Sequence, residues 1–372
     1  MRSGFSVSVI DAFADEEVSA LADNVIPVSL GELGFDANHL LVAVSQLINQ
    51  QNFHVCLYGS GFEAQPALLE ELANMLTVHG NTTQVLRQIK NVETFFTTLS
   101  QFNIPYPKVF SNFPENGDRP LLVKSITGCG GQHIHYVDAT TSLAPDEYFQ
   151  EHVDGESVSV LFVAENTDAG NFAHIVGFNA QWVTPSLTQP FRFGGIASQA
   201  ALTDPCKKRL CEMIRQLSNH FQLVGLNSLD VVIKNEEIFV LEINPRLSAS
   251  FDLYAQDWLE IFDIDLLNLH IACCLGKPLN IQITKKLETL VQQHPSAKAM
   301  QVVYAERDVT LSGSIDWPDW VKDRPIMQEE RQQKSINILK GNPICTVISQ
   351  GNTALSAISA VKSRVNLIHH MM

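Results

Sequence analysis

The sequence is poor in positive charge, and this limits the partners that it can bind. Its 372 residues include 25 Lys and Arg against 40 Asp and Glu, so the net charge is −15. A protein that binds a polyanion through general electrostatics needs an excess of basic residues. We therefore expect no nucleic-acid partner, and we expect any bound phosphate to be held by a few well-placed groups.

Cysteine pairs and long hydrophobic runs are also lacking. The seven cysteines are scattered, apart from the neighbours Cys273 and Cys274, and the absence of a C-x-x-C motif argues against a disulfide framework and a zinc finger. The best apolar stretch, LLVAVSQLI, is too short to cross a bilayer. The opening MRSGFSVSVIDAFADEE turns acidic where a signal peptide needs an apolar core. We expect a cytoplasmic protein without a membrane partner.

A hydrophobic content of 45% predicts a globular protein with a sizeable core, and the length favours two or three domains. The first quarter alternates strand-like and helix-like patterns, which is typical of an α/β domain with a parallel sheet. The expected order is strand 5–13, helix 16–24, helix 39–51, strand 53–61 and helix 64–76. A further helix over 92–102 should end before the prolines of NIPYP.

The stretch VLEINPR, residues 240–246, places Glu242, Asn244 and Arg246 on alternate positions of an apolar run. In a strand, alternate residues share one face of the sheet. Two interpretations stay open for that face. It binds a ligand, or it is the solvated end of an ordinary half-buried strand that Pro245 closes.

The segment LDVVIKNEEIFVLEINPR predicts a hairpin that contains this strand. If the turn is centred on Glu236, Asp230 pairs with Glu242 and both carboxylates point the same way. Two facing carboxylates repel each other, but together with the amide oxygen of Asn244 they form a set of hard oxygen ligands that suits Mg²⁺. Pairing with a lysine would neutralise them instead, although these strands offer only Lys234.

The segment LLVKSITGCGGQHIHYV, residues 121–137, predicts two strands around a glycine turn made of Gly128, Gly130 and Gly131, with Lys124 at the end of the first strand. Glycines allow backbone N–H groups to approach phosphate oxygens closely, and a lysine adds positive charge. The lysine precedes the glycines, so this is not a Walker A loop. The alternative is a tight hairpin with a surface lysine.

The order of these motifs resembles the ATP-grasp superfamily, which includes biotin carboxylase, carbamoyl-phosphate synthetase and D-alanine:D-alanine ligase. The resemblance covers roughly residues 50–275 and rests on order and spacing. Its elements are Lys90, Lys124, the glycine turn, QEHVDGE, Asp230 and the Glu242-x-Asn244-x-Arg246 pattern. VIDAFADEE, YGSGFE and VHGNTTQVLRQIK further resemble a narrower group, the predicted ATP-dependent carboligases related to biotin carboxylase, which occur beside tetrahydromethanopterin-linked one-carbon genes of methylotrophs.

The resemblance implies ATP and Mg²⁺ as cofactors, with two metal ions and with Mn²⁺ as a substitute. It implies that Lys90 and Lys124 hold the ATP phosphates, that the glycine turn closes over them, and that Arg246 lies beside the reacting centre. Lys124 and Arg246 would be the catalytic residues, since positive charge stabilises a transferring phosphoryl group and a tetrahedral oxyanion. The implied metal ligands are Asp230, Glu242 and Asn244, and the implied adenine and ribose contacts are Gln150, Glu151, His152, Val153 and Glu156.

The resemblance also implies the fold, a mixed α/β and α+β protein. It implies a Rossmann-like pre-ATP-grasp domain at 1–80, an ATP-grasp domain at 81–280 with a lid at about 116–155, and a small α+β domain at 281–372 like that of biotin carboxylase. Relatives begin with an extra strand and helix, so we expect the first βα unit to be missing here. A homodimer is one arrangement that the sequence leaves open.

Enzymes of this superfamily activate a carboxylate as an acyl phosphate, which an amine or similar nucleophile attacks, and ADP and phosphate are the by-products. The resemblance therefore predicts a ligase that joins small-molecule carboxylates to amines or thiols, most readily with C–N bond formation, in coenzyme biosynthesis for one-carbon metabolism. Two alternatives stay open, an ATP-binding protein without turnover and a biotin-type carboxylase. Against the latter, the chain contains no AMKM biotin-acceptor segment.

Three further polar features have two interpretations each. Arg192 in FRFGGIAS holds a phosphate or a substrate carboxylate, or it is a surface arginine in a turn. His133 and His135 could share a metal, but two ligands do not make a site and no third histidine is evident. Cys129, inside the glycine turn, is a reactive thiol or a small filler residue.

Overall fold

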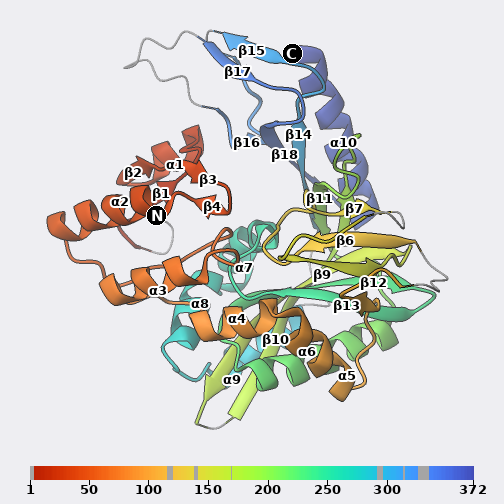
Figure 1. Ribbon diagram of the computed structural model, residues 1–372. Helices are drawn as coiled ribbons and strands as arrows, with labels where there is room; N and C mark the ends of the chain where they lie inside the picture. Colours follow the sequence, from red (N-terminus) through yellow and green to blue (C-terminus); the bar gives the residue numbers. More distant parts are fainter. Residues whose placement is uncertain are drawn as a thin grey trace. The chain divides into compact units, whose positions relative to one another are not determined.

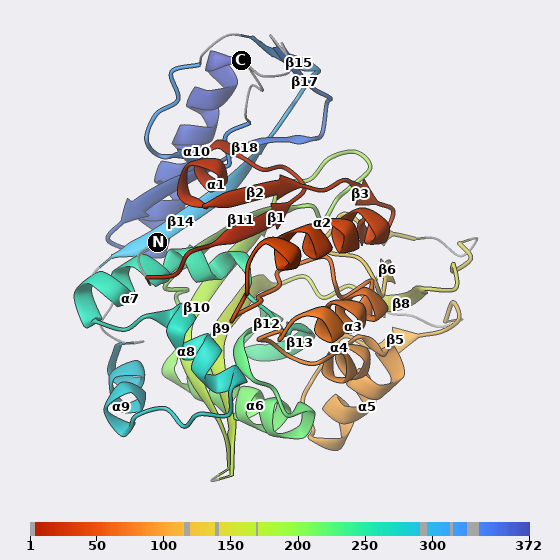
Figure 2. The same cartoon turned by 90° about the vertical axis from the view of Figure 1, so that its left-hand side faces the viewer.

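The structure is a computed structural model, which describes residues 4–114, 120–137, 141–168, 170–290, 296–312, 315–325 and 335–372. Its chain forms two compact units (Figures 1 and 2). The larger unit comprises Phe53–Phe193 and Ser198–His294, and the smaller unit comprises Met1–Asn52, Gly194–Ala197 and Pro295–Met372. The division at 80/81 and 280/281 that the resemblance implies stays a prediction.

The amino-terminal part of the smaller unit confirms the first predicted strand and helix as β1 (Ser8–Asp11) and α1 (Glu16–Leu21). Strand β2 (Asn24–Pro27), which was not predicted, follows them and pairs with β1 in parallel. Helix α2 (Ala37–Gln50) confirms the second predicted helix, and the side chain of its N-cap Asp36 accepts a hydrogen bond from the backbone of His39. The two-residue strands β3 (Leu30–Gly31) and β4 (Gly34–Phe35) were too short to predict.

The carboxy-terminal part of the smaller unit is a sheet covered by a helix. Residues Gly194–Ala197 of β11 (Phe193–Ser198) are followed in the antiparallel sheet by β14 (Ala297–Tyr304), β18 (Pro343–Gly351) and β16 (Val321–Lys322). Strands β15 (Val309–Ser312) and β17 (Ser335–Ile338) form a separate pair. Helix α10 (Ala354–Met371) packs on β14 and β18 through buried residues spaced three or four apart, Ala354, Ala357, Val361, Val365 and Ile368.

The larger unit contains an antiparallel sheet in the order β13 (Glu237–Asn244), β12 (Gly225–Lys234), β9 (Glu156–Thr167) and β10 (Gly170–Val183). Helices α4 (Thr83–Lys90), α5 (Val92–Gln101) and α6 (Asp204–Phe221) share one hydrophobic core with it, and Figure 1 shows them gathered below β12 and β13. On this core side, Val160, Leu210 and Val240 are fully buried. Helix α8 (Leu266–Cys274) contacts β9 and β12, and η1 (Ala249–Leu253), α7 (Ala255–Phe262) and α9 (Ile281–Leu290) complete the unit.

A second sheet of the larger unit carries the predicted glycine turn. Its order is β5 (Val109–Phe110), β8 (Glu147–Glu151), β6 (Leu121–Ser125) and β7 (His135–Tyr136), with all neighbours antiparallel. The strand, glycine turn and second strand expected over residues 121–137 are therefore confirmed. Of the predicted lid at 116–155, residues 116–119 and 138–140 lie outside the described residues.

One predicted strand is wrong. Residues 53–61 form only an isolated parallel bridge between Cys56 and Val78, because Gly59, Ser60 and Gly61 turn the chain where a strand would have to continue. The next predicted helix is confirmed as α3 (Pro66–Met75), which has a proline in its first turn. None of the described helices combines the length and the apolar composition that a bilayer crossing requires.

Candidate active site

The hairpin of β12 and β13 brings two carboxylates face to face. Asp230 and Glu242 are direct cross-strand partners, as predicted, although the turn is not centred as predicted. It contains two residues, Asn235 and Glu236, with φ of 51° and 66°, as a type I′ turn requires. With this two-residue turn and no bulge, Asp230 would pair with Leu241. A β-bulge beside Asp230 shifts the register by one residue, and this shift places Glu242 on the same face as Asp230.

The carboxylate of Asp230 is only partly satisfied by its neighbours. Its Oδ2 accepts a hydrogen bond of 3.0 Å from Nδ2 of Asn244. Its Oδ1 is buried and makes no hydrogen bond among the described residues, although the Ser159 side chain lies close enough to the carboxylate to oppose part of the rise in its pKa. Burial and then the charge of Glu242 raise the pKa of Asp230 to about 6. A buried carboxylate oxygen without a hydrogen bond fits a bound cation, so these residues suit a hard metal ion such as Mg²⁺.

A lysine from a helix pairs with the second carboxylate. Lys90, the last residue of α4, places its Nζ 3.1 Å from Oε2 of Glu242. Burial would raise the pKa of Glu242, but the charges of Lys90 and Lys124 outweigh it and lower that pKa to about 2. Glu242 is therefore ionised at neutral pH. The expectation that only Lys234 could neutralise the hairpin is wrong, because it considered the two strands alone.

Lys124 lies inside the larger unit, with an exposed fraction of 7%. The alternative of a surface lysine is therefore wrong. Burial and then the charge of Lys90 lower the pKa of Lys124, against the opposing effect of Glu242. For Lys90, by contrast, the carboxylates of Glu242 and Glu63 overcome the effect of burial and raise the pKa. A buried ammonium group whose charge is incompletely balanced is a setting that stabilises a bound anion.

The two lysines line one small pocket with Glu242, His133 and Tyr148, whose cavity volume is about 30 Å³. The Nδ1 atom of His133 is buried and has no hydrogen-bond partner among the described residues. Burial and the charge of Lys124 lower the pKa of His133 to about 4, so the ring is neutral at neutral pH. His135 is exposed, and the described part of the chain contains no group of three or more His, Cys, Asp or Glu residues suited to a metal.

Arg246 is held on three sides. Its Nε donates to Oε1 of Glu63, its Nη1 to the carbonyl of Leu247 at 3.0 Å, and its Nη2 to Oδ1 of Asn244 at 3.4 Å. Its side chain is 11% exposed and that of Glu63 is 7% exposed. The interpretation that the polar groups of VLEINPR point into solvent is therefore wrong for Asn244 and Arg246. Glu63 is not among the predicted site residues, although it belongs to YGSGFE, one of the segments that resemble the carboligase group.

The glycine turn packs against the segment that precedes β11. The carbonyl of Gly130 accepts a hydrogen bond of 2.8 Å from the backbone of Phe193. A Cβ atom on Gly131 would lie 2.0 Å from the carbonyl oxygen of Phe191, so only glycine fits there. Arg192 is 5% exposed and its Nε donates to a carbonyl at 3.0 Å. The surface alternative for Arg192 is wrong, while its role toward a substrate stays a prediction. Cys129 is an exposed thiol.

The residues that the resemblance assigns to adenine and ribose lie where β8 leads into β9. Gln150 is 1% exposed, and its Nε2 has no acceptor among the described residues. The backbone N–H groups of Glu151 and His152 are bonded to the carbonyls of adjoining segments. Val153 is buried, and Glu156 is the exposed first residue of β9. Their nucleotide contacts stay a prediction.

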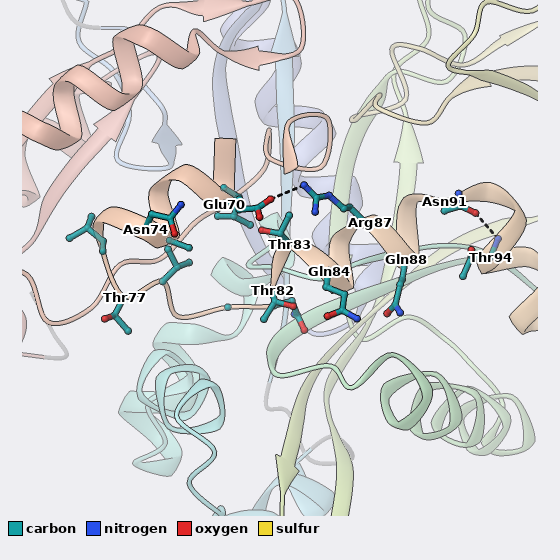
Figure 3. A pocket seen from close by; sticks show the side chains of 16 residues that line it. Glu70, Asn74, Thr77, Thr82, Thr83, Gln84, Arg87, Gln88, Asn91 and Thr94 are labelled. Atoms are coloured by element: carbon teal, nitrogen blue, oxygen red, sulfur yellow. Dashed lines mark hydrogen bonds and ion pairs between the residues drawn. The ribbon is translucent and has the colours of Figure 1, made fainter. Parts of the chain in front are cut away.

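A larger groove runs along α3 and α4, and none of the predicted site residues lines it (Figure 3). Its empty space is about 1710 Å³, solvent included. Its wall carries the ion pair of Glu70 and Arg87 at 2.8 Å, in which both side chains are more than half exposed. The convergent charged groups, Asp230, Glu242, Lys90 and Lys124, are thus found at the smaller pocket and its hairpin, and we take these as the candidate active site.

Comparison with protein families places a known domain over this site. Residues 91–250 match a family model described as the ATP-grasp domain. Two proteins of Methanocaldococcus jannaschii are similar in sequence. One, an uncharacterized protein, is 22% identical over 388 residues, which is 99% of this chain and 86% of that protein. The other, tyramine–L-glutamate ligase, is 26% identical over 135 residues, which is 36% of this chain and 37% of the ligase.

Solved structures have the same fold. A complex of biotin carboxylase from Campylobacter jejuni superposes with a TM-score of 0.67 at 12% identity, over 96% of this chain and 85% of that chain. An L-amino acid ligase from Bacillus licheniformis superposes with a TM-score of 0.66 at 14% identity, over 97% of this chain and 91% of that chain. At these identities the likeness concerns the fold alone, and it confirms the predicted mixed α/β fold.

Proposed function

Residues 91–250 of this chain match the ATP-grasp domain, and from that premise we propose that it is an ATP- and Mg²⁺-dependent ligase of this superfamily. It would activate a carboxylate as an acyl phosphate, which an amine, or a similar nucleophile such as a thiol, then attacks. The observation that carries the proposal is the cluster around the hairpin, in which Asp230 and Glu242 face each other beside Lys90 and the buried Lys124.

The residues around the hairpin fit a metal ion. Glu242 is ionised, and Oδ1 of Asp230 is buried and makes no hydrogen bond among the described residues. Asn244 would add its amide oxygen, which now accepts a hydrogen bond from Arg246. When bound, Mg²⁺ neutralises charge on the phosphoryl oxygens of ATP. Two ions, and Mn²⁺ in place of Mg²⁺, belong to the proposal.

The cationic side chains would bind and orient the charged groups. Lys90 and Lys124 line the same pocket and would hold the phosphates, because phosphoryl transfer depends mainly on positioning and on cationic stabilisation. Gly130 and Gly131 would present backbone N–H groups to them. Arg246 would face the tetrahedral oxyanion that forms when the nucleophile attacks the acyl phosphate.

The sequence relatives include both classes of enzyme. Two are by name tyramine–L-glutamate ligases, 26% and 27% identical over 36% of this chain, and one is by name a pyruvate carboxylase, 21% identical over 48% of it. An L-amino acid ligase and a biotin carboxylase are similar in fold to about the same degree. The higher identity of the ligases favours C–N bond formation, and biotin-type carboxylation is the second candidate. A place in coenzyme biosynthesis for one-carbon metabolism stays a prediction from the resemblance of VIDAFADEE and YGSGFE to the carboligase group.

The experiment that tests the proposal is ADP release from Mg-ATP by the purified chain, against a panel of small carboxylic acids and amines. Glu242→Ala serves as the blank, and Glu237→Ala, an exposed residue of the same strand, serves as the matched control. ADP release that requires both a carboxylate and an amine supports the ligase. Release that requires bicarbonate and biotin supports the second candidate. ATP binding without release under any condition would leave only a nucleotide-binding protein.

A further inference from the structure

We propose that Glu63 is a positioning residue of this site, which fixes the side chain of Arg246 and makes the loop of residues 58–63 one wall of the site around it. The role rests on the proposed function only in so far as Arg246 acts on a substrate. The contact itself is independent of that function, because it joins two buried side chains that lie 183 positions apart in the chain.

The carboxylate of Glu63 is held at both oxygens. Oε1 accepts from Nε of Arg246, and Oε2 accepts a hydrogen bond of 3.0 Å from the backbone N–H of Gly61. The whole Glu63 residue has an exposed fraction of 8%. A carboxylate that is buried and bonded on both sides has one orientation. It can therefore transmit that orientation to the guanidinium group.

The same loop also holds the residue before Arg246. The hydroxyl of Tyr58 lies 2.8 Å from the carbonyl of Asn81 and 3.3 Å from that of Pro245. The Nδ2 of Asn81 donates to the carbonyl of Pro245 at 3.0 Å. Tyr58 and Asn81 are both buried. Loop 58–63 thus contacts the backbone of residue 245 and the side chain of residue 246, which fixes Arg246 from two directions.

These contacts leave one defined edge of the guanidinium for a ligand. Arginine has five N–H groups. Three of them are directed to Glu63, to the carbonyl of Leu247 and to Oδ1 of Asn244. Among the described contacts, one N–H of Nη1 and one N–H of Nη2 have no acceptor. Two such N–H groups match the two oxygens of a planar anion, so the ligand class at this edge is a carboxylate.

Glu63 also balances the charge of the cluster. Lys90, Lys124 and Arg246 face Glu63, Asp230 and Glu242, so the positive and negative side chains are equal in number. Without Glu63, one buried positive charge would be in excess, and a buried uncompensated charge attracts any small anion. Glu63 should therefore favour the carboxylate that fits the free edge over anions that fit poorly.

The test compares Glu63→Gln with Glu70→Gln, an exposed acid of the next helix that pairs with Arg87. The first readout needs no substrate: modification of Arg246 by phenylglyoxal, followed by peptide mass spectrometry. Replacing the carboxylate by an amide removes the charge-assisted hydrogen bond that holds the guanidinium in place, so we expect Arg246 in Glu63→Gln to be more accessible and to react about tenfold faster. Glu70→Gln should react at the wild-type rate, and Glu63→Asp, which keeps the charge, should lie closer to wild type.

The second readout uses turnover. We expect Glu63→Gln to lose about tenfold in kcat while its KM for ATP changes less than twofold, and to be inhibited by lower concentrations of inorganic sulfate than the wild type. A folded Glu63→Gln with wild-type labelling of Arg246 would overturn the proposal. If Glu63→Gln does not fold, Glu63→Ser decides, since wild-type labelling of Arg246 and wild-type sulfate inhibition in a folded Glu63→Ser would overturn the proposal equally.

The two proposals fail in different ways. If no substrate pair gives ADP release in the wild type, the proposed function fails, and the labelling of Arg246 still measures its contact with Glu63. If turnover is present and labelling does not respond to Glu63→Gln, the ligase stands and the positioning role falls.

Discussion

Lys90 at the end of α4 donates a hydrogen bond of 3.1 Å to Glu242 on β13. This contact joins a helix to the hairpin that also carries Asp230, and the two residues are 152 positions apart. The lysine keeps Glu242 ionised, as the lowered pKa of its carboxyl group indicates. The carboxylate of Glu242 therefore stays negatively charged when no cation is bound. A cation that binds there has to share this carboxylate with Lys90.

Glu242→Gln should therefore lower Mg-ATP-dependent ADP release by about a hundredfold or more, because an amide keeps the shape and loses the charge. Urea unfolding should show that the variant stays folded. Glu237→Gln, at the exposed start of the same strand, should behave as wild type. The measurement is the initial rate of ADP release across a Mg²⁺ titration with the best substrate pair. Wild-type rates in Glu242→Gln would exclude Glu242 as a metal ligand.

The glycine turn offers a matched pair of substitutions. Gly130 and Gly131 have similar φ values of 62° and 70°, but a Cβ has open space at Gly130 and would strike the carbonyl of Phe191 at Gly131. The backbone strain of alanine, about 1–2 kcal/mol, is common to both variants. Gly131→Ala should lose about 1–3 kcal/mol of unfolding free energy beyond Gly130→Ala, because the contact must open. Urea denaturation of both variants measures the difference, and equal losses would contradict it.

The nucleotide affinity of the same two variants tests the role of the turn. We expect Gly131→Ala to bind a fluorescent ATP analogue more weakly than Gly130→Ala, since its displaced turn no longer presents N–H groups to the phosphates. Affinity that is the same in the two variants, despite a stability difference, would separate the packing of the turn from phosphate binding.

Much of the site was predictable because it depends on alternation along a strand. Residues 242, 244 and 246 share a face by the period of two, and their pairing with Asp230 followed from one assumed turn position. The assumed turn was wrong and the pairing was right, because the bulge beside Asp230 compensates for a turn that is shorter than expected. A bulge of this kind has no strong local signal in a single sequence.

The residues that escaped prediction contact the site over long sequence distances. Glu63 reaches Arg246 across 183 positions, and no periodicity links the two segments. The strand predicted at 53–61 is wrong for a similar reason, because residues 58–63 form a loop whose contacts are with the distant residues Pro245 and Arg246. Local patterns predict which face of an element is polar. They do not predict which distant polar group will meet it.

The turn of the β12–β13 hairpin contains backbone strain at Glu236, and a substitution that relieves this strain should raise the free energy of unfolding. Glu236 has a φ of 66°, which disfavours a residue with a Cβ atom. Glu236→Gly should stabilise the protein by about 0.5–1 kcal/mol, because glycine adopts the second position of a type I′ turn without strain. Glu236→Ala, which keeps the Cβ, is the control and should not stabilise. Urea unfolding and ADP release measured together should show higher stability with unchanged turnover, and a stabilised Glu236→Ala would refute the explanation.

The stability of the larger unit should depend on pH through His270. Its Nδ1 accepts a hydrogen bond of 2.8 Å from the backbone N–H of Leu226, and its Nε2 lies 3.1 Å from the carbonyl of His79. The ring is 2% exposed. Nδ1 must therefore be unprotonated in the folded chain, and burial lowers the pKa of His270.

The sign follows from the lowered pKa. The unfolded chain takes up the proton near pH 6.5 while the folded chain does not, so the contribution of His270 is complete above about pH 6.5 and is lost as the pH falls below it. The slope for one such group approaches about 1.4 kcal/mol per pH unit. We expect His270→Gln to be less stable than wild type at pH 7.5 and to show a smaller fall in unfolding free energy down to pH 5.5. His135→Gln, at an exposed position, should keep the wild-type pH dependence. Urea unfolding followed by tryptophan fluorescence at the two pH values measures these differences, and a wild-type pH dependence in His270→Gln would assign the effect to other groups.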